Sequence, residues 1–327
     1  MYEAAAKPEV YVIAGVKPRT KGEKLQGVPI GLGEALLHRI LKDPDTAVIA
    51  TYHSKEPDQE FLDALPSKDK VRFLRLDSSV AEDYSALHDY VKESHGSIDH
   101  LIHSISAIPE PSRTKRRDII QRMKINNGLA LQDLPANPNV VYLSDYNPDD
   151  LLKAIDIIAV SYARLQNAMD DLMPAGSNTA AFTFVNRQTA PNYAAANLGK
   201  MVLEELALKR GGEDKKRIHY LFNTGFYLSP KTSTIPYSDH LVEHIREKYR
   251  GKVMTADDVA GFVYSIISNN PDLRDRSPLQ PSGKITFDMY PIDFTSNEAG
   301  IFFAQKLKEK QVSEQREKMN KPVTEKP

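Results

Sequence analysis

Apolar segments and amphipathic segments alternate along the first hundred residues, and this order restricts the fold more than any other feature of the chain. The apolar segments are short and β-branched, as strands are, whereas the segments between them repeat apolar residues at helical spacing. Parallel strands joined by helices form doubly wound sheets, which bind ligands at the carboxyl ends of their strands. Strands are predicted at 9–15, 46–52, 70–77 and 98–106, and helices at 33–41, 58–65 and 81–94.

The pattern breaks between residues 107 and 145 and then resumes. The segment 149–172 has helical spacing and is apolar on most faces, which predicts a buried helix. A helix that starts at Tyr193 is predicted to end at Arg210, because two glycines at 211–212 follow as a stop signal. Further strands are predicted at 178–185, 217–223 and 283–289, with a helix at 255–267 capped by Thr255 and Asp258.

The complete pattern predicts an α/β chain with a Rossmann-type, doubly wound parallel sheet of about seven strands and helices on both faces. Residues 1–300 are expected to form this single NAD(P)-binding domain. The expected domain has insertions near 17–26 and 108–145 and a substrate lid near 225–252, and a charged helical tail follows at 301–327.

Composition excludes several classes of function. The formal net charge of -1 gives no argument for binding to nucleic acid or to an anionic membrane. The absence of cysteine excludes disulfides, thiolate metal sites and a cysteine nucleophile. No apolar run approaches the ~20 residues of a membrane span, and the first residues lack the basic and apolar regions of a signal peptide. A cytoplasmic protein is therefore expected.

A glycine-rich turn joins the first predicted strand to the first predicted helix. Gly15 ends the strand, and Gly31 and Gly33 stand at the start of the helix. Glycines at such a turn let a pyrophosphate approach the backbone N–H groups at the positive end of the helix. This order predicts a dinucleotide site, with a turn that residues 17–26 make unusually long.

The helix that begins near Tyr193 contains a second chemical signal. Lys200 follows after close to two helical turns, so both side chains project from one face of the helix. A nearby ammonium favours the ionised form of a phenol, which suits the phenol to donate a proton or a hydrogen bond to a developing oxyanion. The pair therefore predicts a catalytic tyrosine supported by a lysine.

These segments resemble the short-chain dehydrogenase/reductase superfamily and, within it, the divergent enoyl-[acyl-carrier-protein] reductases of bacterial fatty acid synthesis. Residues 29–35, PIGLGEA, stand at the start of that group's first helix, and residues 102–107, IHSISA, stand at its His-Ser-Ile-Gly strand end. Tyr193 and Lys200 reproduce its Tyr-x6-Lys spacing, whereas most of the superfamily has Tyr-x3-Lys. The resemblance covers the chain apart from the tail and the two insertions.

The resemblance implies reduction of the C=C bond of a 2-enoyl thioester with NADH or NADPH. Tyr193 would hydrogen-bond the thioester carbonyl as it becomes an enolate, and Lys200 would hold the nicotinamide ribose hydroxyls. The implied cofactor-binding residues are Gly15, Gly31, Leu32, Gly33, Asp77, Ser78, Ser104, Ile105, Ser106, Lys200, Thr224, Gly225 and Ser229. The implied substrate-binding residues are Ala107, Thr183, Phe184, Tyr193, Phe226 and Tyr227.

The chain also departs from the family pattern. Where the family has a second tyrosine upstream of the first, this sequence has Phe, Thr and Phe at 182–184, and Ala180 replaces the superfamily serine. No acidic residue closes the second predicted strand, so the choice between NADH and NADPH stays open. Lys17, Arg19 or Lys55 would be suited to meet a 2'-phosphate.

The basic segment 113–124 has six Lys or Arg residues against one acid, Asp118. It is either a solvated surface insertion or a surface for coenzyme A or an acidic acyl carrier protein. The family resemblance further implies a homotetramer or a dimer formed through the long helices at 149–172 and 193–210.

Other interpretations were weighed against enoyl reduction. Residues 240–244 match the H-x-x-E-H pattern of inverted zinc metallopeptidases, yet nothing in the alternating strands requires zinc, and no metal site is expected. His100 and His103 lie three apart in one strand, so they point to opposite faces and are not expected to share a metal. A reductase of ketones or other conjugated carbonyls, or a non-catalytic dinucleotide-binding sensor, also fits the pattern.

Overall fold

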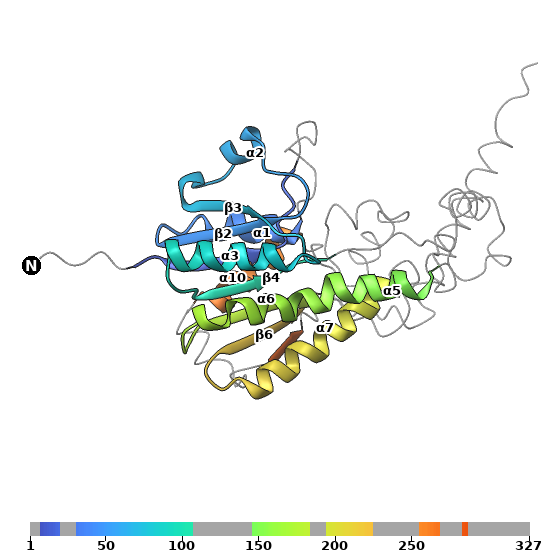
Figure 1. The fold of residues 1–327 in the computed structure, drawn as a ribbon. Coiled ribbons are helices and arrows are strands. Elements are labelled where there is room, and N and C mark those ends of the chain that lie inside the picture. The colour runs from blue at the N-terminus through green and yellow to red at the C-terminus, as the bar shows by residue number, and fades with distance from the viewer. Residues whose placement is uncertain are drawn as a thin grey trace, which may run out of the picture.

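A parallel sheet of seven strands in the order β3-β2-β1-β4-β5-β6-β7 forms the centre of the protein (Figure 1). The computed structural model describes residues 7–19, 31–106, 146–183, 194–224, 255–268 and 283–286. The chain moves outward from β1 to β3 and then crosses to β4 on the other side of β1, so the predicted Rossmann-type, doubly wound fold is confirmed. The strands are β1 (Glu9–Ala14), β2 (Thr46–Tyr52), β3 (Val71–Arg75), β4 (His100–His103), β5 (Asn178–Thr183), β6 (Ile218–Asn223) and β7 (Gly283–Thr286).

Helices cover both faces of the sheet (Figure 1). Side chains alternate along β1, so Tyr11 and Ile13 pack into the cluster that contains α1 and α10, whereas Val10 and Val12 face α3 and α6. Because both faces are buried, β1 is apolar at every position after Glu9. The helices are α1 (Leu32–Ile40), α2 (Gln59–Asp63), η1 (Lys68–Lys70), α3 (Ala81–Ser94), α5 (Pro148–Ile155), η4 (Asp156–Val160), α6 (Ser161–Met169), η5 (Asp170–Leu172), α7 (Ala194–Glu213) and α10 (Ala256–Ile267).

The long helix predicted at 149–172 exists but is interrupted by η4, a π-helical turn. At its end the backbone N–H of Ser161 bonds to the carbonyl of Asp156, five residues earlier. The prediction that this helix is buried holds for α6 but is wrong for much of α5, where Leu152 is 62% exposed. Figure 1 shows the reason, since α5 extends beyond the end of the sheet.

Helix α7 packs closely against α5 and η4 at Gly199. A Cβ atom on Gly199 would lie 2.8 Å from the carbonyl oxygen of Ala154 and 2.9 Å from Cδ1 of Ile158, so a larger residue would push the helices apart. The predicted end of α7 at Arg210 is wrong, because the helix continues through both glycines to Glu213. Neither glycine adopts the positive φ that a left-handed helix cap requires.

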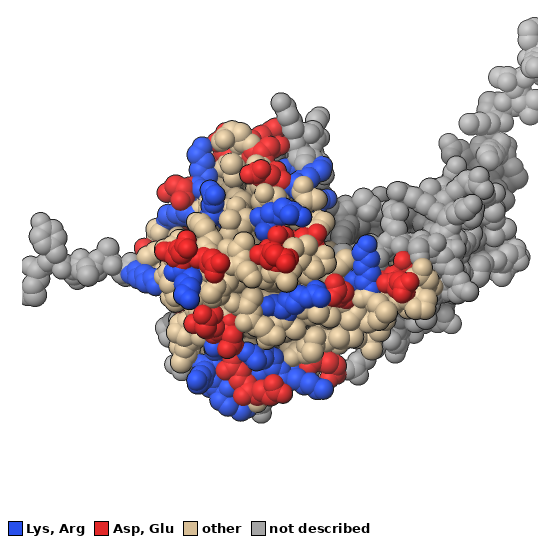
Figure 2. Space-filling view, in the orientation of Figure 1, with Lys and Arg blue, Asp and Glu red and all other residues tan. Residues whose placement is uncertain are grey.

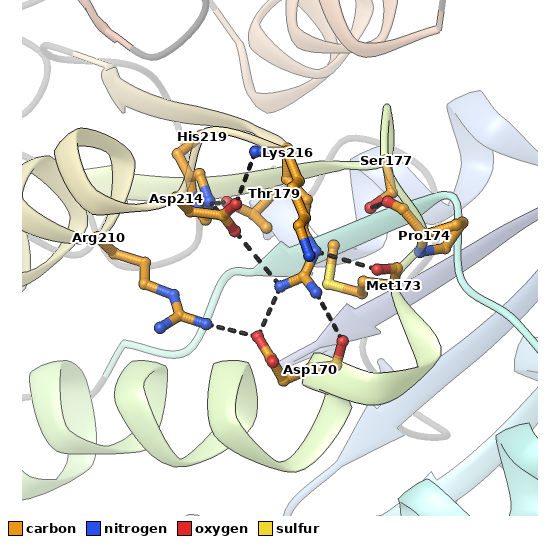
Figure 3. A network of polar contacts seen from close by, with 10 residues as sticks. Asp170, Met173, Pro174, Ser177, Thr179, Arg210, Asp214, Lys216 and His219 are labelled. Atoms are coloured by element: carbon orange, nitrogen blue, oxygen red, sulfur yellow. Dashed lines mark hydrogen bonds and ion pairs between the residues drawn. The ribbon is translucent and has the colours of Figure 1, made fainter.

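A network of ion pairs joins α6, α7 and β6 at the amino end of the sheet (Figure 3). The guanidinium of Arg217 donates to the carboxylate of Asp170 at 2.6 Å, to its backbone carbonyl at 2.8 Å and to the carbonyl of Met173 at 3.0 Å. Arg210 from α7 donates to the same Asp170 carboxylate. The Arg217 side chain is only 11% exposed, whereas the Asp170 side chain is 49% exposed, so a buried guanidinium here meets a half-exposed carboxylate.

The face of the molecule in Figure 2 shows Lys and Arg residues interspersed with Asp and Glu residues. This face therefore presents no field of a single sign to a polyanion. In the part of the chain that the structure describes, no helix is both long enough and apolar enough to cross a membrane.

Replacement of Arg217 tests the network. Arg217→Ala is expected to lower the free energy of unfolding by about 2 kcal/mol, because it removes three hydrogen bonds that a largely buried guanidinium donates to Asp170 and Met173, and leaves Arg210 as the remaining cation on the Asp170 carboxylate. The measurement is urea denaturation followed by circular dichroism. Arg72→Ala on the exposed surface of β3 is the matched control and should leave the free energy of unfolding nearly unchanged. An equal loss in both variants would contradict this role of Arg217.

Candidate active site at the carboxyl edge of the sheet

Two glycines let the β1–α1 connection and the end of β4 meet without side chains between them. Gly15 has φ +100°, and a Cβ there would lie 2.8 Å from the backbone nitrogen of Ile105. A Cβ on Gly33 would lie 2.5 Å from the carbonyl oxygen of Gly15. Backbone therefore packs on backbone here, as a turn that takes a pyrophosphate requires.

Gly31 differs from these glycines because it borders open space. It occupies the N-cap position of α1 with φ -73°, and among the described residues no side chain caps the helix there and a Cβ would meet nothing within 4 Å. The first N–H groups of a helix lack intrahelical partners and favour an anion. The first turn of α1, which starts at Leu32, thus places the positive end of the helix beside the glycine contact.

Two side-chain hydroxyl groups form hydrogen bonds with the backbone of this turn. The hydroxyl of Ser104 donates to two backbone carbonyls, with its Oγ 3.0 Å from the oxygen of Ala14 and 3.1 Å from that of Gly15. Thr51 Oγ1 accepts the N–H of Gly15 at 3.2 Å. Ser104 therefore fixes the turn through its hydroxyl, while Ile105 and Ser106 continue the chain along this edge.

Lys200 brings a buried ammonium to the same edge. Its residue is only 8% exposed, and Nζ donates to the carbonyl of Phe182 at 2.7 Å. The pairing of β4 with β5 ends at His103 and Ala181, so the Phe182 carbonyl lies one residue beyond the last paired position. The ammonium therefore binds a carbonyl just past the end of β4, and its charge lies at the carboxyl ends of the central strands.

Thr183, the last residue of β5, follows Phe182 directly and places a buried hydroxyl at the end of this strand. The residue is 1% exposed, and its Oγ1 has no hydrogen-bond partner among the residues that the structure covers. Its backbone carbonyl accepts the N–H of Thr224, which is itself buried at the end of β6. A buried hydroxyl without a partner is uncommon and marks a place where a polar group is expected.

His103, the last residue of β4, is fully buried between the sheet and α6. Its Nε2 lies 2.8 Å from Ser161 Oγ on α6, and its ring meets Tyr162 edge-on at 5.6 Å between centroids. Burial, together with the charge of Lys200, lowers the pKa of His103 to about 3. The imidazole is therefore neutral at physiological pH.

His100 lies on the other face of the sheet from His103, as the strand period predicts. Its ring stacks on Tyr11 with centroids 4.1 Å apart, and its nitrogens meet Glu9 and the side-chain oxygen of Asn178. The Asn178 amide donates to the carbonyl of Ile267, which leaves Oδ1 as acceptor. Both ring nitrogens of His100 thus lie against side-chain oxygens, and the hydrogen bond from His100 holds the pKa of Glu9 below its usual range.

Asp77 follows β3 at the edge where an adenine was expected. The hydroxyl and N–H of Ser79 bind its Oδ1 at 2.7 and 3.0 Å, and the side-chain bond lowers the pKa of the carboxyl group. His53 Nε2 lies 3.5 Å from its other oxygen. Ser78 is 7% exposed and contributes its carbonyl to Tyr84 rather than an open hydroxyl to the edge.

Of the three cations considered for a 2'-phosphate, Arg19 is already paired. Its Nε donates at 2.7 Å to Glu34, a carboxylate that is 1% exposed on α1. Lys17 and Lys55 are exposed. The Arg19–Glu34 pair fastens the segment after β1 to α1, a role that the spacing of the two residues did not suggest.

Several predicted residues and segments lie outside the described residues. They are Ala107, Phe184, Tyr193, Gly225, Phe226, Tyr227 and Ser229, together with the basic segment 113–124 and the H-x-x-E-H match at 240–244. Among the residues that are described, no group of three or more His, Asp or Glu side chains is arranged to hold a metal ion.

A separate cavity of about 350 Å³ opens at the amino edge of the sheet, lined by Glu9, Asp99, His100 and the segment 174–177 among others. Its polar side chains bind one another or the backbone, as Asp99 does in accepting the N–H of Val10 at 2.8 Å. The glycine contact and Lys200 lie at the opposite edge, where ligands of doubly wound sheets bind.

No protein-family model matches the chain, and no curated protein matches it. Among solved structures, the chain is similar to the enoyl-acyl carrier protein reductase of Bacillus cereus, crystallised with NADP+ and indole naphthyridinone. The TM-score is 0.61 and the identity 16%, over 86% of this chain and 95% of that chain. The likeness agrees with the Rossmann-type fold described above.

The two glycines of the turn allow a matched test. Gly33→Ala is expected to lower the free energy of unfolding by roughly 1–3 kcal/mol, because the new methyl group meets a backbone carbonyl that cannot move aside. Gly31→Ala places the same methyl group in open space and should cost less than about 1 kcal/mol. Thermal and urea denaturation of both variants measure the difference, and equal losses would argue against the close contact.

His103 predicts a pH dependence of stability. Its folded pKa of about 3 lies below the ordinary value of 6.5, so only the unfolded chain takes up a proton between these values. The stability that this group contributes is complete above pH 6.5 and falls as the pH is lowered, by about 2 kcal/mol at pH 5. Urea denaturation at pH 7 and pH 5 should show a smaller acid loss in His103→Gln than in the native protein, and identical losses would contradict a buried, neutral His103.

Proposed function

We propose that this protein reduces the C=C bond of a 2-enoyl thioester with NADPH or NADH. The observation that supports this most strongly is the buried ammonium of Lys200 at the carboxyl edge, seven residues after Tyr193 in sequence. The glycine contact at Gly15 and Gly33 fits a pyrophosphate, because any side chain there would fill the turn. The similar fold of the Bacillus cereus reductase with NADP+ adds support.

Each residue of the site is proposed to bind a different part of the dinucleotide. The open N-terminal end of α1 at Gly31 suits the pyrophosphate, since its free N–H groups and the helix dipole both favour an anion. Lys200, already fixed by the Phe182 carbonyl, suits the ribose hydroxyls and keeps the local potential positive. When bound, the nicotinamide supplies the hydride to the β-carbon of the enoyl group.

Tyr193 is the proposed hydrogen-bond donor to the thioester carbonyl. As the β-carbon is reduced, charge collects on this oxygen, and a donor fixed beforehand stabilises the enolate. The positive charge of Lys200 nearby favours this developing negative charge. Thr183 stands at the end of β5 with a buried hydroxyl, where the resembled family has its second tyrosine, and is proposed to contribute to the substrate side.

The thioester carrier is proposed to be coenzyme A or an acidic acyl carrier protein, which the basic segment 113–124 would complement in charge. A cytoplasmic homotetramer or dimer is part of the same proposal. Its support is the exposure of large apolar side chains on α5 and α7, where Leu152 is 62%, Met201 44% and Leu208 41% exposed.

The assay follows oxidation of NADPH and of NADH at the nicotinamide absorbance, with crotonyl and longer 2-enoyl thioesters. The native protein is expected to turn over, and Tyr193→Phe is expected to lose at least about tenfold in kcat, because loss of one oxyanion donor commonly costs ~10² in rate. Tyr90→Phe, on α3 and away from the site, is the matched control and should keep full activity.

Dinucleotide binding without reduction of any thioester would overturn enoyl reduction and favour a carbonyl substrate or a sensor. Failure of both dinucleotides to bind the native protein would overturn the proposed cofactor as well. Turnover that is unaffected by Tyr193→Phe would leave the reaction in place and remove the role assigned to the tyrosine.

A further inference from the structure

The loop after β3, residues 76–80, lies at the same edge of the sheet as the glycine turn. The N–H of Leu76 bonds to the carbonyl of Tyr52, and the N–H of Val16 bonds to that of Thr51, so the chain segments that leave β1, β2 and β3 lie next to one another. Neighbouring strands are ~4.8 Å apart, which puts this loop about 10 Å from the turn after β1. That separation suits the adenosine half of a dinucleotide whose pyrophosphate binds at the turn.

Side chains from two helices hold this loop in place. The carbonyl of Ser78 accepts from Nη1 of Arg164 on α6 at 2.9 Å and from the hydroxyl of Tyr84 on α3 at 3.1 Å. The N–H of Asp77 donates to the carboxylate of Asp83 at 2.7 Å. Burial raises the pKa of Tyr84 to about 12, so its hydroxyl stays a donor at physiological pH. The backbone around Asp77 is therefore fixed from both α3 and α6.

The π-helical turn aligns Asp156 with Arg164. The two residues are eight positions apart, which in a regular α-helix would turn their side chains about 80° away from each other. Because η4 contains one extra residue, they are related as residues one position closer would be, and lie nearly on one face. Nη2 of Arg164 accordingly lies 2.9 Å from Oδ1 of Asp156. The guanidinium thus binds a carboxylate of its own helix through one nitrogen and the loop after β3 through another.

This ion pair lies at the protein surface. The side chains of Arg164 and Asp156 are 38% and 34% exposed, and ion pairs of this kind contribute little to stability. The direction of the guanidinium is nevertheless specific, since a planar group bonded on two sides has few orientations. The contact therefore fits a role in placing the loop better than a role in stabilising the fold.

We propose that Arg164 is a positioning residue for the adenine end of the site. Supported by Asp156, it holds the loop at the Ser78 carbonyl and so fixes Asp77 where a purine amino group is bound. This role rests on the proposed function, in which a dinucleotide binds along the carboxyl edge.

The Asp77 carboxylate gives the adenine end a chemical preference. Its side chain is 25% exposed, Ser79 binds Oδ1, and Oδ2 lies 3.5 Å from the exposed ring of His53. An ionised carboxylate accepts a hydrogen bond from an amino group but repels a carbonyl oxygen. Adenine has an amino group where hypoxanthine has an oxygen, so a correctly placed Asp77 distinguishes the two bases.

The test compares the affinities of NADH and NADPH with those of their hypoxanthine analogues by titration calorimetry. The native protein is expected to prefer adenine about tenfold, the usual effect of one hydrogen bond to a charged group. Arg164→Met should lower this preference to less than about threefold. Arg72→Met, which removes an exposed arginine from β3, is the matched control and should keep the native preference. A ratio of affinities separates the two roles, because a loosened fold weakens the binding of both bases alike.

Asp156→Asn tests whether Asp156 acts through Arg164. Alone it should lower the adenine preference about twofold, and combined with Arg164→Met it should lower it no further than Arg164→Met does. Losses that add would contradict the support assigned to Asp156. Should Arg164→Met fail to fold, Arg164→Lys replaces it, since a lysine has no planar fork to reach both partners and should also lower the preference.

An adenine preference that is equal in the native protein and in Arg164→Met would overturn the proposal, as would a native protein that binds both bases alike. Adenine preference without reduction of any thioester would overturn enoyl reduction alone and leave the role of Arg164 in place. If neither dinucleotide binds the native protein, the proposed cofactor fails, and the adenine end of the site fails with it.

Discussion

The contact between Gly33 and the carbonyl of Gly15 is the constraint on which the site depends. With no Cβ at either position, the start of α1 lies directly on the turn after β1, and Ile105 approaches the same turn from the end of β4. Three segments distant in sequence thereby meet where the chain reverses its direction across the sheet. This meeting places the open N-terminal end of α1 beside the central strands.

The unequal lengths of β4 and β5 create the second half of the site. Because β4 ends at His103, the backbone of β5 continues past its neighbour and leaves the Phe182 carbonyl to find another donor. Lys200 is that donor, and Gly199 allows α7 to come close enough by packing against Ala154 and Ile158. A buried lysine is thus held at the carboxyl edge of the sheet in part by a backbone acceptor.

Hydrophobic periodicity predicted most of the fold, because each buried strand had to be apolar on both faces and each helix on one. The strand at Thr46–Tyr52, the helix at Ala81–Ser94 and the capping box of Thr255 with Asp258 agree with the structure residue by residue. The predicted end of a helix was wrong where it depended on a residue type that occurs both inside helices and after them. Glycine at 211–212 allows a helix to stop, but with ordinary φ angles it also continues the helix.

The close contact of the turn was predictable from its glycines, because only glycine lets two backbone segments pack so closely. The role of Tyr193, which lies outside the described residues, stays a prediction. The contact between Ser161 and His103 was not predictable, since it depends on a hydrogen bond displaced by one residue within a helix. A one-residue shift of this kind leaves the hydrophobic periodicity of the sequence nearly unchanged, so the periodicity does not reveal it. The histidine itself was visible in the sequence, yet only the structure shows that His103 bonds to a helix serine, whereas His100, three residues earlier, meets Glu9 and Asn178 on the other face of the sheet.

The π-helical turn at η4 holds one residue more than an α-helical turn of the same rise. Side chains before it and after it therefore follow two different helical registers within one continuous helix. Ala154 and Ile158 face α7, while Ser161, Tyr162 and Leu165 face the sheet. One extra residue inside a continuous helix rotates the side chains that follow it relative to those that precede it. Ser161 therefore meets His103 at the carboxyl edge of the sheet, and no loop is needed to bring it there.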